Sequence, residues 1–402
     1  MSNRALNSFQ EKCVVKIMAA TDWSREAVIE HVEDAHIRMG ITYADYTQYR
    51  FWTVPVEKQG IKYKLILNER MERRVNFARG TAKYVAKVMA KTGWSFEYAE
   101  AQILDAQKRT ECNFKEYYVY RMYEMTHEEQ ARVFVSRVAK KIKKYNVNNE
   151  WFRTIIYDKT KTNEYFSEFL TRPWCVNNRI EKDNFVRLFK DSTRIIYKPA
   201  KGLQGKSVMA FAVDPSNIDS VYEQVASLPV GVVEEYVVQH PKMSAMCPSS
   251  VNTIRVCTIS SYSKPVSKGG NYLEIPYATL RVGNGMAVVD NFHSGGMAAA
   301  IDLKTGKLVT NGANEEGETF EKHPVTGVTF KGFEIPFFAE AIDFVKEMCE
   351  KKRVEGYIGW DIAITEDGPV MIEVGSSPGA VLLTAPYIDE KCDTMHIMEK
   401  YL

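Results

Sequence analysis

The N-terminal third of the sequence contains two copies of one motif. Residues 18–51 align without a gap with residues 89–122, and Trp94 follows Trp23 by the same offset of 71 residues that separates Asp105 from Asp34 (94 − 23 = 105 − 34 = 71). The other identities include Met18/Met89, Thr21/Thr92, Ser24/Ser95, Glu26/Glu97, Ala35/Ala106, Arg38/Arg109, Tyr46/Tyr117, Tyr49/Tyr120 and Arg50/Arg121. Such a repeat requires the same local structure twice.

Each copy predicts a helical hairpin. A serine suited to cap a helix follows the tryptophan, and a glutamate two residues later falls in the first helical turn. About 15 helix-compatible residues follow, and the first copy then breaks at Gly40. Tyr46, Tyr49 and Arg50 have the i, i+3, i+4 spacing of one face of a second helix.

Two interpretations of the repeated aromatic residues remain open. They are core residues that pack the hairpins together or against the rest of the chain, or they belong to a docking module that presents tyrosine and arginine to a substrate, a protein or a carrier. Two units are too few for a solenoid.

Strand patterns begin after about residue 145. Apolar runs separated by Gly and Pro predict strands at 193–199, 207–213, 230–237, 252–260, 275–282, 286–292 and 357–364, and a helix at 335–352. Because most strands follow one another without an intervening helix, we expect an α+β fold. We therefore expect a helical region at 1–145 and a second domain at 146–402.

Composition narrows the class of protein. The 402 residues carry a net charge of +2 and have no long Lys/Arg block, so no nucleic-acid partner is expected. No apolar stretch approaches the length of a membrane span, and no signal peptide is visible. Seven scattered cysteines without CxxC spacing predict a reduced, cytoplasmic protein.

A glycine-containing loop lies between two predicted strands in 195-IIYKPAKGLQGKSVMAF-211. Gly202 and Gly205 would let the backbone fold over phosphates, and Lys198 and Lys206 would supply cations on either side. The spacing is not that of a P-loop, and a structural turn is an equally good interpretation.

Two acidic residues follow the apolar start of 230-VGVVEEYVVQH-240. A glutamate at this place can bond a nucleotide's amine or ribose hydroxyls while the strand backbone reads the base edge. Taken alone, Glu234 and Glu235 would more often mark a strand end that faces water.

A third acidic pair lies near the C-terminus, in 357-YIGWDIAI-364 and 370-VMIEVGSSPG-379. A three-residue turn at 366–368 would pair Thr365 with Pro369 and place Asp361 opposite Glu373. Two facing carboxylates repel each other unless a cation lies between them, and hard oxygen ligands beside a phosphate loop suit Mg²⁺. The alternatives are that each acid pairs with a basic neighbour, or that a one-residue change of register separates them.

Taken in order, these elements resemble the ATP-grasp superfamily. The branch called sugar-transfer-associated ATP-grasp is the most similar, through 248-PSSVNTIRV-256, 290-DNFHSGGMAAAIDLKTGK-307 and 358-IGWDIAI-364. The resemblance covers about residues 150–402 and excludes the repeat. It implies two α+β subdomains that clamp ATP, preceded by an all-α region built from the two-fold helical-hairpin repeat.

The resemblance also implies roles for individual residues. Lys198 and the loop with Gly202, Gly205 and Lys206 would hold the ATP phosphates, together with Lys159 at the start of a helix in 158-DKTKTNEYFSEFL-170. Glu234, Glu235 and the backbone to Val237 would form the adenine hinge, with Gln239 or His240 at the ribose. Arg255 and Arg281 would contact the transferred phosphoryl group, and Asp361 and Glu373 would bind Mg²⁺. His293 would line the acceptor pocket or act as a base, although a structural histidine in a Gly-rich turn is equally compatible.

The implied activity is that of an ATP- and Mg²⁺-dependent ligase that forms ADP through an acyl phosphate. Its substrates would be a sugar acid, an amino acid or a peptide, joined to an amine or a related nucleophile. Two alternatives are a kinase of the same fold and a non-catalytic nucleotide-binding module whose repeat docks a partner. The usual Glu-x-Asn ends here in Gly375, which weakens the expected metal site unless Ser376, Ser377 or water replaces the asparagine.

Overall fold

The chain folds into two compact units. The computed structural model describes residues 6–39, 41–145, 150–202, 207–262, 272–285, 292, 295–376 and 378–402. The units are Met1–Lys83 and Tyr84–Leu402, and their boundary falls inside helix α4 (Val56–Thr92). Each unit therefore contains one copy of the repeat. The domain boundary expected after residue 145 is a different division and stays a prediction.

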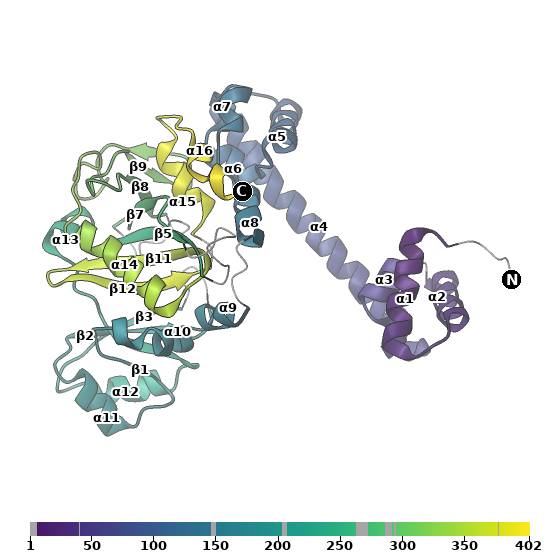
Figure 1. The fold of residues 1–402 in the computed structure, drawn as a ribbon, viewed down its shortest axis with the longest axis horizontal. Helices are drawn as coiled ribbons and strands as arrows, with labels where there is room; N and C mark the ends of the chain where they lie inside the picture. Colours follow the sequence, from purple (N-terminus) through teal and green to yellow (C-terminus); the bar gives the residue numbers. More distant parts are fainter. Residues whose placement is uncertain are drawn as a thin grey trace. The chain divides into compact units, whose positions relative to one another are not determined.

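The first unit is helical. Its elements are α1 (Ser8–Thr21), α2 (Arg25–Met39), α3 (Tyr43–Gln48), η1 (Phe51–Thr53) and the first part of α4 (Figure 1). Tyr46 and Phe51 are almost fully buried in its core, and Trp23 packs against the same core while partly exposed. Within the described ranges, none of the helices combines the length and the apolar character needed to cross a bilayer.

The second copy of the repeat has the same elements 71 residues later. These are α5 (Phe96–Thr110), α6 (Phe114–Val119) and η2 (Met122–Glu124). The local contacts also correspond: Gln59 donates to the carbonyls of Phe51 and Val54, and Gln130 donates to those of Met122 and Met125. The second helix of each copy differs from the expected one, because it is only six residues long and ends before the arginine. Arg50 and Arg121 both have φ 49°, in the left-handed region.

More helices connect the second copy to the rest of its unit. They are α7 (His127–Ala131), α8 (Ser136–Tyr145), α9 (Glu150–Ile156), α10 (Lys159–Tyr165) and η3 (Ser167–Phe169).

A four-stranded antiparallel sheet follows, in the order β1-β4-β2-β3. Its strands are β1 (Trp174–Val176), β2 (Arg194–Pro199), β3 (Met209–Ala212) and β4 (Gly231–Glu235). The helices α11 (Lys182–Phe189) and α12 (Ile218–Ala226) cover one face, where Ile195, Tyr197 and Val233 form part of a common core. The opposite face carries Lys198 and Glu234, because side chains alternate along a strand.

The larger sheet is also antiparallel. Seven of its strands lie in the order β10-β9-β8-β7-β5-β11-β12, and β6 pairs with β5. The strands are β5 (Thr253–Ser261), β6 (Tyr272–Glu274), β7 (Ala278–Val282), β8 (Met297–Ile301), β9 (Gly312–Asn314), β10 (Thr319–Phe320), β11 (Gly356–Thr365) and β12 (Gly368–Gly375). The helical elements are α13 (Pro241–Met246), α14 (Phe338–Lys352), α15 (Ala380–Thr384), η6 (Ala385–Tyr387), α16 (Thr394–Met398) and η7 (Glu399–Tyr401). The strand predicted at 286–292 lies almost wholly outside the described residues.

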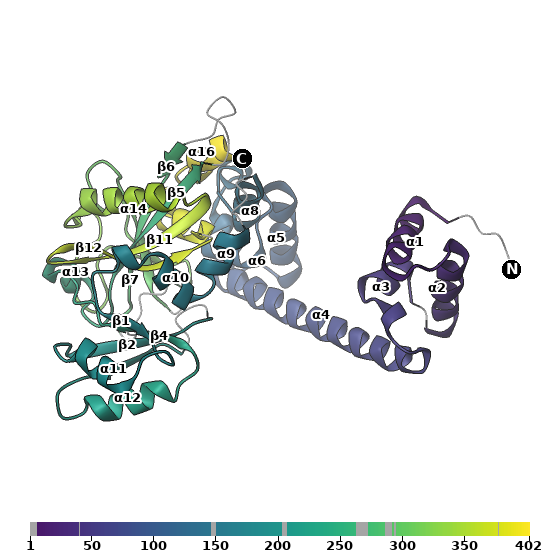
Figure 2. The same cartoon turned by 60° about the horizontal axis from the view of Figure 1, so that its bottom comes forward.

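Two cores sandwich the larger sheet. Ile254, Trp360 and Ile362 face a core that includes α14. Cys257, Ile259 and Tyr357 face a second core, which contains α15 and the second copy of the repeat. Figure 2 shows α14 and α8 beside this sheet. The second repeat copy is therefore part of the same hydrophobic core as the sheet.

The docking of the second copy depends on the turn between β9 and β10. Gly317 in this turn has φ +69°, and a Cβ at this position would lie 2.9 Å from the carbonyl oxygen of Val119. We predict that Gly317→Ala lowers the free energy of unfolding by about 1–3 kcal/mol more than Gly327→Ala does. Gly327 has a similar φ of +74°, but among the described residues no atom lies within 4 Å of its Cβ position. Urea denaturation of both variants checks this, and equal losses would mean that the close contact contributes nothing.

Candidate functional site

The two C-terminal acids lie opposite each other on β11 and β12. Asp361 pairs with Glu373, as the sequence predicts, but the route differs from the expected one. The turn has two residues, because Thr365 pairs with Gly368 rather than with Pro369, and a bulge between Asp361 and Ile362 shifts the register by one. Without that bulge, Glu373 would lie on the other face of the sheet.

Asp361 is a buried carboxylate held by two arginines. Arg255 donates from Nε and Nη2 to its two oxygens at 2.5 and 2.9 Å, and Arg281 donates from Nη1 at 2.6 Å. Burial alone would raise the pKa of the Asp361 carboxyl, but the charges and hydrogen bonds of the two guanidinium groups outweigh it and hold the pKa well below its usual range. Asp361 is therefore ionised at neutral pH.

Strand register brings these three residues together. Arg255 on β5 lies directly opposite Asp361, and Arg281 lies on β7, the next strand along. Trp360 anchors β11 from the other face: its ring is fully buried and its Nε1 donates to Thr258 at 2.9 Å. The polar row therefore lies across neighbouring strands on one face of the sheet, with apolar residues directly behind it.

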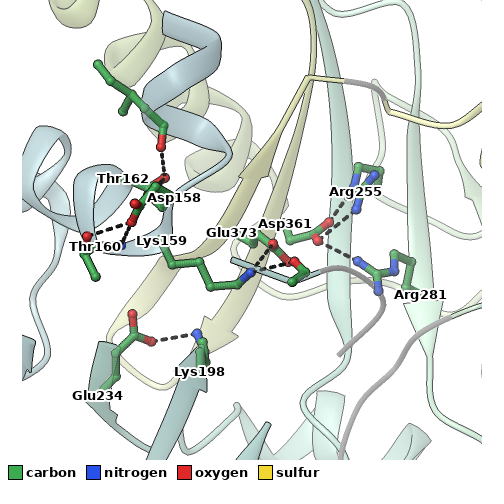
Figure 3. Close-up of polar contacts among 12 residues, drawn as sticks. Asp158, Lys159, Thr160, Thr162, Lys198, Glu234, Arg255, Arg281, Asp361 and Glu373 are labelled. Atoms are coloured by element: carbon green, nitrogen blue, oxygen red, sulfur yellow. Dashed lines mark hydrogen bonds and ion pairs between the residues drawn. The ribbon is translucent and has the colours of Figure 1, made fainter. Parts of the chain in front are cut away.

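Glu373 is the accessible acid of the pair. Half of its side chain is exposed, and it forms an ion pair with Lys159 at 3.5 Å. Lys159 begins α10, which Asp158 caps, and its Nζ also donates to the carbonyl of Gly202 at 3.1 Å. Figure 3 shows Lys159 extending from α10 toward Glu373, with Asp361 and its arginines beyond. Lys159 thus connects the predicted phosphate loop with the acid pair.

Glu234 belongs to a second buried ionic network. It accepts hydrogen bonds from Lys198 at 2.7 Å, from Arg172 at 2.8 Å and from Asn163 at 2.7 Å. Burial alone would raise the pKa of this carboxyl, but the charges of Arg172 and Lys198 reverse the effect and hold the pKa well below its usual range. Glu234 is therefore paired with cations, and its carboxylate orients Lys198. Its predicted place in the adenine hinge stays a prediction.

Arg172 joins this network to the larger sheet. Its Nη1 donates at 2.8 Å to the carbonyl of Met371 on β12, next to the bulge that places Glu373. Its side chain is 8% exposed. Sequence reasoning missed both Arg172 and Asn163: Asn163 lies in the quoted 158–170 element but was given no role there, and Arg172 lies in none of the quoted motifs. An arginine just before 173-PWCV-176 was the available signal, but nothing local links it to Glu234.

The remaining hinge residues have different surroundings. Glu235 accepts from the Ser192 hydroxyl at 2.8 Å. The peptide group of Val237, which follows β4, has no hydrogen-bond partner among the described residues, so it can still bond the edge of a base.

The two predicted ribose residues have structural contacts. Gln239 donates to the carbonyls of Cys247 and Ser250 and accepts from Asn252, so it braces a loop. The Nδ1 of His240 accepts from the Lys242 amide at the start of α13. Gly205, Lys206 and His293 lie outside the described residues, as does Ser377.

Whether Asp361 and Glu373 can bind Mg²⁺ depends on how many of their carboxylate oxygen positions are still available. Three of the roughly four hydrogen-bond acceptor positions of the Asp361 carboxylate are occupied by arginine donors. Among the described residues, Glu373 has one ion pair, with Lys159 at 3.5 Å, so most of its acceptor positions are available. With Lys159, the group holds three cations and two anions, which disfavours a lone divalent ion. These residues fit a Mg²⁺ that enters together with nucleotide phosphates, as this ion commonly does.

The two ionic networks predict an acid-sensitive stability. The folded-state pKa values of Glu234 and Asp361 are lowered, so their stabilisation is present above the unfolded values of about 4.5 and 3.8 and is lost as pH falls below them. We predict that the free energy of unfolding of Glu234→Gln depends less steeply on pH in this range than that of the native protein. Glu366→Gln, in the exposed β11–β12 turn, is the control and should keep the native slope. Urea titrations between pH 3 and 7 (about the range in which carboxylates titrate) measure both slopes, and identical slopes for all three proteins would contradict the assignment.

Solved structures of ATP-grasp ligases are similar to this chain at low identity. The ADP complex of N5-carboxyaminoimidazole ribonucleotide synthetase (PurK) has 11% identity over 60% of this chain and 51% of its own, with a TM-score of 0.35. D-alanine–D-alanine ligase from Bacillus anthracis has 15% identity over 66% of this chain and 74% of its own, with a TM-score of 0.36. The chain thus spans about half the length of the first of these structures. No curated protein matches the sequence.

The family model described as sugar-transfer associated ATP-grasp matches residues 137–387, which is more than half of the 402 residues. The match includes both sheets up to β12, the two ionic networks and the loop after β2. It begins inside α8, after the second copy of the repeat. This chain belongs to the sugar-transfer associated ATP-grasp family.

Proposed function

We propose that this protein is an ATP- and Mg²⁺-dependent ligase that joins a carboxylate to an amine or a related nucleophile through an acyl phosphate. The observation that carries the proposal is the convergence of Lys159, Arg255 and Arg281 on the Asp361–Glu373 pair. Its substrate would be a sugar acid, an amino acid or a peptide.

The charge balance favours a polyphosphate. Lys159, Arg255 and Arg281 exceed the two acids by one positive charge, and Lys198 lies on the facing sheet with Glu234 as its partner. Phosphate oxygens can compete for Lys159, because its 3.5 Å contact with Glu373 is long and half of the Glu373 side chain is exposed. Lys198 is held more firmly, with its Nζ 2.7 Å from a buried carboxylate.

The chemistry follows from the weakness of a carboxylate as an electrophile. An oxygen of the substrate carboxylate attacks the γ-phosphorus of ATP, the bond from that phosphorus to the bridging oxygen breaks, and ADP leaves. The amine then attacks the acyl carbon, loses a proton, and expels phosphate as the C–O bond breaks. Such phosphoryl transfer depends mainly on positioning and on cations.

The arginines would carry the electrostatic part of this reaction. Arg255 and Arg281 are oriented by Asp361, so they need little reorganisation as charge develops on the transferred phosphoryl group. Arg255 also donates to the Pro378 carbonyl at 3.0 Å, which holds the loop after β12 close to the site. When bound, Mg²⁺ would neutralise phosphate charge, with Glu373 and the remaining acceptor position of Asp361 as its protein ligands.

A non-catalytic nucleotide-binding protein is the second candidate. It is favoured by the engagement of Asp361 with two guanidinium groups and by Gly375, which offers no ligand. A kinase would be distinguished by a stable phosphorylated product without an incorporated nucleophile.

The first test measures ADP release with a panel of sugar acids, amino acids and peptides, each with amines. We expect Glu373→Gln to lower turnover roughly 100-fold, because it removes an anionic ligand without unfolding a half-exposed position. Asp367→Asn, in the exposed turn of the same hairpin, is the matched control and should keep full activity. Nucleotide binding without ADP release on any pair would support the second candidate, and absence of nucleotide binding would overturn both.

Gly375 offers a gain-of-function test. Among the described residues no atom lies within 4 Å of its Cβ position, and its φ is outside the left-handed region, so a side chain fits. We predict that Gly375→Asn lowers the Mg²⁺ concentration required for ADP binding about ten-fold, by adding an oxygen ligand two residues after Glu373. Gly375→Ala controls for the added Cβ. An unchanged Mg²⁺ requirement in Gly375→Asn would place the metal away from this strand end.

A further inference from the structure

The two copies of the repeat present related surfaces, one covered and one exposed. We propose that the first copy is a docking surface for an acidic turn of a partner protein, which it binds as the second copy binds the turn between β9 and β10. This inference is independent of the proposed ligase activity.

The second copy shows how an acidic turn is recognised. Arg121 donates from Nε to the carbonyl of Gly317 at 2.6 Å and pairs with Asp389 at 3.2 Å. Lys115 pairs with Glu315 at 2.8 Å, and Lys87 pairs with Glu316. The second copy thus binds the turn through both a backbone carbonyl and side-chain carboxylates. A protein offers this combination, whereas a nucleic acid or a lipid does not.

Two of the three cations have counterparts in the first unit, one within the first copy and one two residues before it. Lys16 is the counterpart of Lys87 and Arg50 is that of Arg121, and both are exposed. Lys16 lies in α1, which ends at the position equivalent to the end of α4. Arg50 immediately precedes η1, as Arg121 precedes η2. Lys62 adds a third cation close by, since its Nζ donates to the carbonyl of Tyr49 at 2.6 Å. Lys115 alone has no cationic counterpart, because Ala44 takes its place.

Arg50 has an unusual backbone conformation for an exposed residue. Its φ of 49° is that of Arg121, and a non-glycine residue in this region costs about 1 kcal/mol. In the second copy this conformation aims a guanidinium at the Gly317 carbonyl. In the first copy no described residue forms a hydrogen bond or an ion pair with the Arg50 side chain. The sequence therefore keeps an arginine where glycine or asparagine would be less strained.

The apolar part of the surface differs between the copies. Val119 is almost fully buried against the rest of its unit, and the equivalent residue in the first copy is the exposed Gln48. The first copy thus lacks this apolar contact but keeps the cations. We therefore expect its binding to a partner to be mainly electrostatic, reversible and weaker at high salt concentration. The partner should accordingly be a separate protein with an acidic turn, bound transiently.

The experiment uses the full chain and a fluorescent cyclic peptide with residues 311–321 of this sequence, NGANEEGETFE. We expect fluorescence anisotropy to show binding that Arg50→Gln weakens about three- to ten-fold. Arg25→Gln is the matched control, because it removes an exposed arginine of the same unit whose partner is Glu11, and it should bind as the native chain does. Glu315→Gln and Glu316→Gln in the peptide should weaken binding to a similar extent.

Further variants separate docking from folding. Arg50→Gly should unfold no more easily than the native protein, since glycine relieves the left-handed conformation, but it should lose the peptide as Arg50→Gln does. Binding that is absent in the native chain, or equal in native, Arg50→Gln and Arg25→Gln proteins, would overturn the proposal. Tighter binding to a single-stranded oligonucleotide or to anionic vesicles than to the peptide would also overturn it, because the surface would then select phosphate.

Discussion

The pairing of Asp361 with two arginines is the constraint on which the candidate site depends. Three charged groups are removed from most of the solvent, and they are tolerated because each satisfies the others. The arrangement requires β7, β5 and β11 to keep their register, since a slip of one residue on any strand would place a guanidinium or the carboxylate in the apolar core behind the sheet. The same pairing aims two cations at the side of the sheet where Lys159 and Glu373 meet.

The Glu234 network plays the corresponding part on the smaller sheet. Its carboxylate holds Lys198 in place, and Arg172 carries the connection across to the Met371 carbonyl on β12. The two sheets are therefore linked by one buried guanidinium close to the bulge that sets the position of Glu373. A nucleotide between the sheets would meet cations whose positions are set before it binds, which is the condition for electrostatic catalysis.

The repeat shows how one local structure can acquire two environments. The bounds of the repeat helices and the left-handed arginine are the same in both copies, because they depend on short-range hydrogen bonds. The surroundings differ, and Val119 and Gln48 at equivalent positions illustrate this: the valine belongs to the core of the larger unit, whereas the glutamine is exposed. Val119 is thus one of the positions that distinguish the covered copy from the exposed one, as are Lys115 and Tyr118, whose equivalents are Ala44 and Thr47.

The sequence by itself determined the α+β class, the family and the pairing of Asp361 with Glu373, because alternation of apolar residues and short connections are local properties. The route to this pairing was not predicted: the structure has a two-residue turn and a bulge, and the sequence pattern did not distinguish this from a three-residue turn. Tertiary structure alone decided that Asp361 and Glu234 are ion-paired and that Arg172 joins the two sheets. The physical reason is that these contacts join residues 36 to 199 positions apart, and their strength depends on burial and on the register of whole sheets rather than on any neighbouring residue.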